Sequence, residues 1–154
     1  MDSPDSTNAN PDADPLLHLA FTGLDHAIDS VEASGGPLIP FVLARTGDRL
    51  SLQRFLTERL EDGLAEVEQH LAAVIAGDRG DRTAEVDADV DGACGAWDGY
   101  LTVEGRRTDA VLARAVDRTG AEVVLAQRYE VRGLLRKTAR RVGNAALIAD
   151  NRRE

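Results

Sequence analysis

Cysteine, lysine, aromatic residues and long apolar runs are all scarce in this chain, and most of these scarcities exclude a class of protein. Cys94 is the only cysteine among 154 residues, which excludes an intrachain disulfide and a cysteine-rich zinc site. No apolar run approaches the ~20 residues of a transmembrane helix, and the N-terminus lacks the basic and apolar regions of a signal peptide. We therefore expect a cytoplasmic protein that does not associate with membranes.

The length and composition predict one folded domain. The chain has only one tryptophan, two tyrosines and three phenylalanines, so a core must consist mainly of leucine, valine, isoleucine and alanine. A chain of this length can bury roughly two-thirds of its unfolded surface. Residues 1–13 contain almost nothing to bury, so we expect a disordered leader there. We expect a single domain over residues 14–149 and a flexible basic tail over 150–154.

Charge is unevenly distributed along the chain. The formal net charge is −9, with 25 acids and 11 bases in residues 1–131 but only two acids and seven bases in residues 132–154. An acidic body repels phosphate, so binding to nucleic acid is not expected. The basic C-terminal segment, which includes the only lysine (Lys137), is expected to neutralise the acidic body within one subunit or across a dimer.

Three segments have the periodicity of helices. Asp14 followed by Pro15 predicts an N-cap and first turn, and Gly35-Gly36-Pro37 predicts the end of that helix. A second helix is predicted over residues 57–76 and a third over residues 133–149. The apolar positions of the third helix are Leu135, Ala139, Val142 and Ala146.

The remaining segments predict strands joined by short connections that contain glycine. The expected strands are Leu38–Arg45, Arg49–Phe55, 84–91, 98–104, 108–117 and 121–131. Short connections between strands make neighbouring strands antiparallel. We therefore predict an α+β fold of two layers, with an antiparallel sheet of five to six strands, about three helices and the order α-β-β-α-β-β-β-β-α.

The acidic stretch before Trp97 has two incompatible interpretations. Asp87, Asp89, Asp91 and Asp98, with Gly92, have the spacing of a calcium loop, which binds its cation through carboxylate oxygens. The same stretch has the alternation of a strand whose acids face water, and a calcium loop would need flanking helices. The strand is the favoured interpretation. The alternative is a Ca²⁺ or Mg²⁺ site, and no other cofactor is expected.

A second group of residues is the candidate for contact with a ligand or a partner protein. It gathers aromatic and charged side chains from neighbouring predicted strands, a combination that is common at protein interfaces. Its members are Trp97, Tyr100, Arg107, Asp109, Arg128 and Tyr129. Packing in the core, contact with a partner and a small-ligand site are all open for this group.

No known catalytic motif occurs, so no catalytic residue is predicted. The sequence has no nucleophile elbow, P-loop or dinucleotide-binding glycine motif. The leading hypothesis is a non-catalytic interaction or adaptor domain that forms a homo-oligomer, with a dimer favoured, and binds an unidentified protein. A sheet face, or the apolar sides of helices 57–76 and 133–149, would form the interface. The alternatives are an enzyme or small-molecule binder with a pocket between sheet and helices, and the divalent-cation protein described above.

Overall fold

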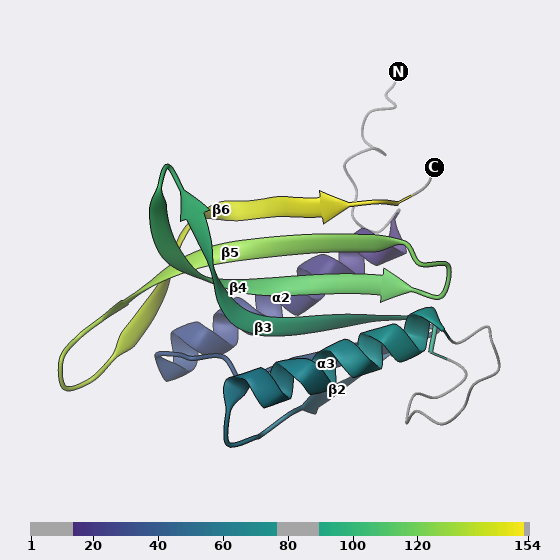
Figure 1. Cartoon of the computed structure of the whole chain (residues 1–154), viewed down its shortest axis with the longest axis horizontal. Coiled ribbons are helices and arrows are strands. Elements are labelled where there is room, and N and C mark those ends of the chain that lie inside the picture. The colour runs from purple at the N-terminus through teal and green to yellow at the C-terminus, as the bar shows by residue number, and fades with distance from the viewer. Residues whose placement is uncertain (1–13, 77–89, 153–154) are drawn as a thin grey trace.

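The computed structural model describes residues 14–76 and 90–152, which form two helices and six strands (Figure 1). The helices are α2 (Pro15–Ser34) and α3 (Leu60–Ile75). The strands are β1 (Phe41–Thr46), β2 (Arg49–Arg54), β3 (Gly92–Val103), β4 (Arg106–Asp117), β5 (Glu122–Arg132) and β6 (Thr138–Asp150).

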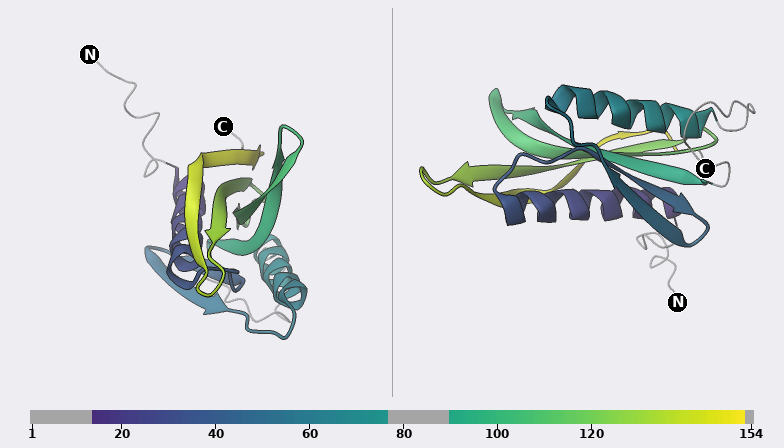
Figure 2. Two further views of the ribbon diagram at one scale, coloured as in Figure 1. Left: turned by 90° about the vertical axis from the view of Figure 1, so that its left-hand side faces the viewer. Right: turned by 90° about the horizontal axis from the view of Figure 1, so that it is seen from below.

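All six strands belong to one antiparallel sheet with the order β2-β1-β3-β4-β5-β6. The α+β class and the antiparallel sheet are therefore confirmed. Helix α2 packs against β3 to β6 on one face, and α3 packs against β1, β3 and β4 on the other (Figure 2). The arrangement thus has three layers, helix, sheet and helix, instead of the two that we expected.

The first helix forms as its sequence predicts. The Asp14 carboxylate accepts hydrogen bonds from the amides of Leu16 (3.0 Å) and Leu17 (3.2 Å), which satisfies donors that a helix N-terminus leaves open. At the other end Gly35 adopts a left-handed conformation (φ 87°), and its amide donates to the carbonyl of Val31. Helix α3 is shorter than the predicted 57–76 and has no side-chain cap.

The predicted third helix over residues 133–149 is wrong, because this segment holds the edge strand β6. Gly133 and Gly143 have positive φ values of 105° and 70°, a geometry that a helix does not accommodate. Strand β5 also needs a neighbour for its second set of backbone groups, and β6 supplies it along nearly its whole length, with two register shifts. The apolar spacing of this segment, alternately four and three residues, favours a helix, and the pairing of its backbone with β5 overrides that preference.

The start of β3 also differs from the prediction. Strand β3 begins at Gly92, six residues before the expected strand 98–104. Most of the expected strand 84–91 lies outside the described residues, while Val90 and Asp91 belong to no strand. At the C-terminus, residues that we assigned to a tail continue the fold: Asp150 ends β6, and the amide of Asn151 donates to the carbonyl of Glu122.

Both helices contact the same short segment of β3, Gly92–Ala96, from opposite faces of the sheet. A Cβ atom added to Gly23 of α2 would lie 2.4 Å from Sγ of Cys94. A Cβ atom added to Gly95 would lie 2.3 Å from Cγ1 of Val67 on α3. A carbon atom cannot approach a sulfur or carbon atom this closely. The absence of a side chain at Gly23 and Gly95 therefore allows each helix to pack at its observed distance from the sheet.

We predict that Gly95→Ala lowers the free energy of unfolding by about 1–3 kcal/mol, because the new methyl group overpacks the contact between β3 and α3. Val67 and Leu71 on α3 are fully buried and have no space into which to move. Urea denaturation followed by circular dichroism measures the change.

Gly99→Ala is the matched control, since Gly99 lies on the same strand and the same face. Its added Cβ would meet mainly Cδ1 of Leu112 at 2.9 Å, the end of a partly exposed side chain that can rotate away. Equal losses of stability in the two variants would show that the close approach of α3 is unimportant.

Candidate functional site

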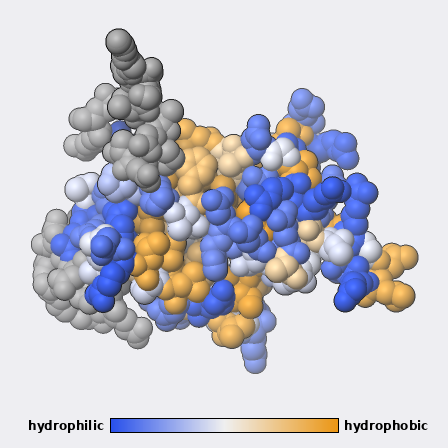
Figure 3. All heavy atoms as spheres, turned by 180° about the vertical axis from the view of Figure 1, so that it is seen from behind, coloured by the Kyte–Doolittle hydropathy of each residue, from blue (hydrophilic) through white to orange (hydrophobic). Residues whose placement is uncertain are grey.

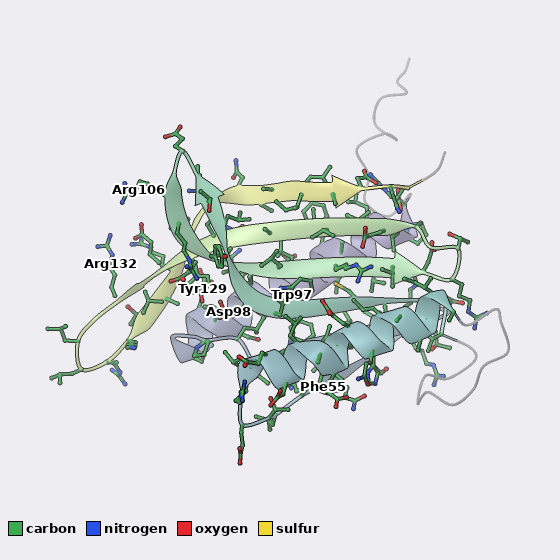
Figure 4. All side chains as sticks on the ribbon, viewed as in Figure 1. Phe55, Trp97, Asp98, Arg106, Tyr129 and Arg132 are labelled. Carbon is green, nitrogen blue, oxygen red and sulfur yellow. The ribbon has the colours of Figure 1, made fainter. Side chains whose placement is uncertain are left out.

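A hydrogen-bonded pair, the half-buried Asp98 and the buried Tyr129, connects the sheet to the segment after α2 (Figure 4). The Tyr129 hydroxyl lies 2.7 and 2.9 Å from the two carboxylate oxygens of Asp98 and donates to them. The amide of Leu38 donates to the same carboxylate at 2.7 Å. The pair therefore holds the segment between α2 and β1 against β3 and β5.

The surroundings of this pair favour its uncharged forms. Burial raises the pKa of Asp98, and the nearby Asp109 carboxylate adds to the increase, although the donors from Leu38 and Tyr129 oppose it. Burial and the hydrogen bond to Asp98 also raise the pKa of Tyr129. Tyr129 stays protonated and donates a hydrogen bond to Asp98, so it links two parts of the structure. The geometry assigns it no role in proton transfer.

We predict that Tyr129→Phe lowers the free energy of unfolding by about 1–2 kcal/mol, because it removes a donor from a carboxylate that is half-buried. Equilibrium denaturation in urea measures the loss. Tyr100→Phe is the control: Tyr100 is half-exposed, and its ring keeps the contact with Arg107, so a change below ~0.5 kcal/mol is expected. A similar loss in both variants would contradict a specific role for the pair.

The raised pKa of Asp98 predicts a dependence of stability on pH. The folded state holds the Asp98 proton more tightly than the unfolded chain, so the wild type loses stability as the pH rises from about 3.8 through the raised pKa. Asp98→Asn cannot titrate, so its stability relative to the wild type should increase over this pH range. Denaturation of both proteins at a series of pH values tests this, and a constant difference would refute it.

The structure distributes the six predicted contact residues over both faces of the sheet. The register places Tyr100, Arg107, Asp109 and Tyr129 on the face of α2, and Trp97 and Arg128 on the opposite face. Among them, Arg107 lies over the Tyr100 ring, 3.7 Å from its centroid. The six residues therefore do not converge on one pocket between sheet and helices.

The described part of the predicted metal site has other partners. Asp91 accepts a hydrogen bond from the amide of Gly47 at 2.6 Å, and Asp98 binds Tyr129 and Leu38 as described above. Asp87 and Asp89 lie outside the described residues. Within residues 14–76 and 90–152, no three histidine, cysteine or acidic side chains are grouped as metal ligands. Divalent-cation binding stays a prediction.

A cavity with a volume of about 650 Å³ lies where α2 begins and β6 ends. Its charged side chains are bound within the protein. Asp14 caps α2 and pairs with Arg152, while Arg45 and Arg118 donate to the carbonyls of Pro15 and Val90. Asp117 accepts hydrogen bonds from the backbone of its own turn. These contacts hold together chain segments that meet at this end of the sheet.

A smaller groove of about 180 Å³ lies beside the start of α3, and we call it the α3 groove. It is mostly apolar with an acidic rim. Its lining residues are Leu38, Pro40, Leu60, Glu61, Leu64, Trp97 and Asp98. Trp97 is thus the one residue of the predicted contact group that lines this groove.

Residues 132–138, which connect β5 to β6, form a projection that the sequence did not predict and that we call the arm (Figure 1). Leu134 and Leu135 at its tip are 98% and 103% exposed. Basic residues flank the two leucines on both sides: the segment has the sequence Arg-Gly-Leu-Leu-Arg-Lys-Thr and contains no acid. Gly133, directly after β5, is the residue that could have indicated a turn, because its φ of 105° is one that glycine adopts readily.

The base of the arm is fixed to helix α2. Arg141 pairs with Asp29 (2.8 Å) and Glu32 (2.9 Å), and its backbone amide also donates to Glu32. The bond from Arg141 lowers the pKa of Glu32. The carbonyl of Lys137 lies so close to Gly35 that an added Cβ there would be 2.6 Å away. Only the tip of the arm therefore projects freely.

No helix in the described part of the chain is long and apolar enough to cross a membrane. No protein-family model, curated protein or solved structure matches the chain.

Proposed function

We propose that this protein is a non-catalytic interaction domain that associates with itself. The observation that carries the proposal is the arm, which presents two neighbouring leucines to solvent at the end of a projecting hairpin. Figure 3 shows the apolar tip with hydrophilic side chains beside it. Exposed apolar groups concentrated on a projecting element are typical of surfaces that bind another molecule.

The free energy gained by burying the tip leucines is comparable to the cost of association, so a dimer depends on more than these leucines. Burial of one leucine side chain contributes about 1.5–3 kcal/mol, so the four tip leucines of a dimer supply roughly 6–12 kcal/mol. Association itself costs about 4–15 kcal/mol. The apolar term therefore offsets much of the cost, and charged contacts around the leucines decide the affinity.

Cys94 and two of the three histidines, His26 and His70, are engaged in packing within the protein, which supports a non-catalytic role. Cys94 is fully buried, and burial raises the pKa of its thiol to about 12. His26 packs against Phe41, and His70 packs against Phe55 while bonding to the carbonyl of Glu66.

We predict that the wild-type protein has a mass of about twice 16.5 kDa at micromolar concentration and dissociates on dilution. Size-exclusion chromatography with light scattering, followed by analytical ultracentrifugation over a dilution series, measures this. A mass of one chain at all concentrations up to the millimolar range would refute self-association.

A further inference from the structure

We propose that the arm of one subunit binds in the α3 groove of a second copy, and that the two subunits exchange arms reciprocally. This inference rests on the proposed self-association and names the surfaces that perform it. The arm is an apolar tip with basic flanks, and the groove is an apolar hollow with acidic surroundings.

The apolar parts of the two surfaces complement each other. The α3 groove is lined by Leu60, Leu64 and Trp97, with Leu60 itself 43% exposed. Leu56, which precedes the helix, is also largely exposed. A leucine from the arm would cover these groups and would itself leave water, so both sides lose exposed apolar area in one contact.

The charges around the apolar parts are of opposite sign. The arm carries Arg136 and Lys137 beside its leucines, and neither forms an ion pair with another described residue. Glu58, just before α3, and Glu61 and Asp62 in its first turn are exposed. Glu61 also pairs with Arg59 of its own subunit, but the three acids outnumber this one base, so the surface beside the groove is acidic. Complementary charges of this kind select a partner and set the register of an interface.

The position of both surfaces allows a closed dimer. The arm and the start of α3 lie at the same end of the molecule, opposite to the end at which β6 finishes (Figures 1 and 2). A twofold axis at this end would place each arm against the groove of the other subunit, so one symmetric contact uses both surfaces twice. The same complementarity also favours a second copy over an anionic surface, which would repel the acidic body.

Exchange of charges between the arm and the groove tests the proposal. The arm variant is Arg136→Glu/Lys137→Glu, and the groove variant is Glu58→Lys/Glu61→Lys. Each variant alone should dimerise at least about tenfold more weakly than the wild type, because like charges then face each other in both contacts. An equimolar mixture should form a heterodimer about as stable as the wild-type dimer, because both contacts then join opposite charges.

The outcomes separate this inference from the proposed function. A monomeric wild type would overturn self-association and the arm contact together. Variants that dimerise as strongly as the wild type would leave self-association intact and place the interface elsewhere. Weak dimers that the mixture does not rescue would show that the arm and groove are not each other's partners, and circular dichroism would confirm that each variant is folded.

Cross-linking gives a second test that leaves the charges of the arm and the groove unchanged. Leu135→Cys combined with Leu60→Cys should form a covalent dimer with a short bismaleimide, while buried Cys94 stays unreactive. The matched control combines Leu135→Cys with Leu50→Cys, a leucine of similar exposure (48% against 43%) on the opposite edge strand β2. Leu135→Cys alone measures links between two tips, and equal yields in the three proteins would overturn the proposal.

Discussion

The approach of two helices to one short segment of strand is the contact on which the fold depends. Gly92–Ala96 of β3 has side chains small enough for α2 to pack on one face and α3 on the other. Because the two helices contact the same strand, a change in that strand affects both cores at once. The position of α3 in turn places Leu60 and Glu61 beside Trp97, which creates the α3 groove.

The two ends of the molecule differ in how their charges are satisfied. At the end where β6 finishes, aspartates and arginines bind one another or nearby backbone groups around the larger cavity. At the other end, the two leucines of the arm and the bases Arg136 and Lys137 project into solvent, while Arg132 pairs with Glu130. The proposed self-association therefore uses the second end, where the protein leaves two leucines uncovered and Arg136 and Lys137 without an ion pair to another described residue.

Local chemistry in the sequence predicted some elements well and missed others for a physical reason. Asp14 and Gly35 determine the ends of α2 through contacts within one turn, so these ends could be read directly. The first half of β3 has glycine, alanine and cysteine, which favour a strand only weakly, and only its contacts with both helices explain it. Strand β6 was missed because its pairing with β5 is a property of the sheet. The arm was missed with it, and Asp98 and Tyr129 were assigned to separate sites because their contact spans 31 residues.

The anchored base of the arm has a consequence for the thermodynamics of association. The bonds from Arg141 to Asp29 and Glu32 restrict the base of the arm before any partner binds. A preorganised element loses less conformational entropy on binding than a flexible loop does. The ion pairs between Arg141 and α2 would thus increase the affinity of the arm by keeping its base rigid. High salt would weaken these ion pairs, and association would become weaker partly because the arm of the free subunit becomes more flexible.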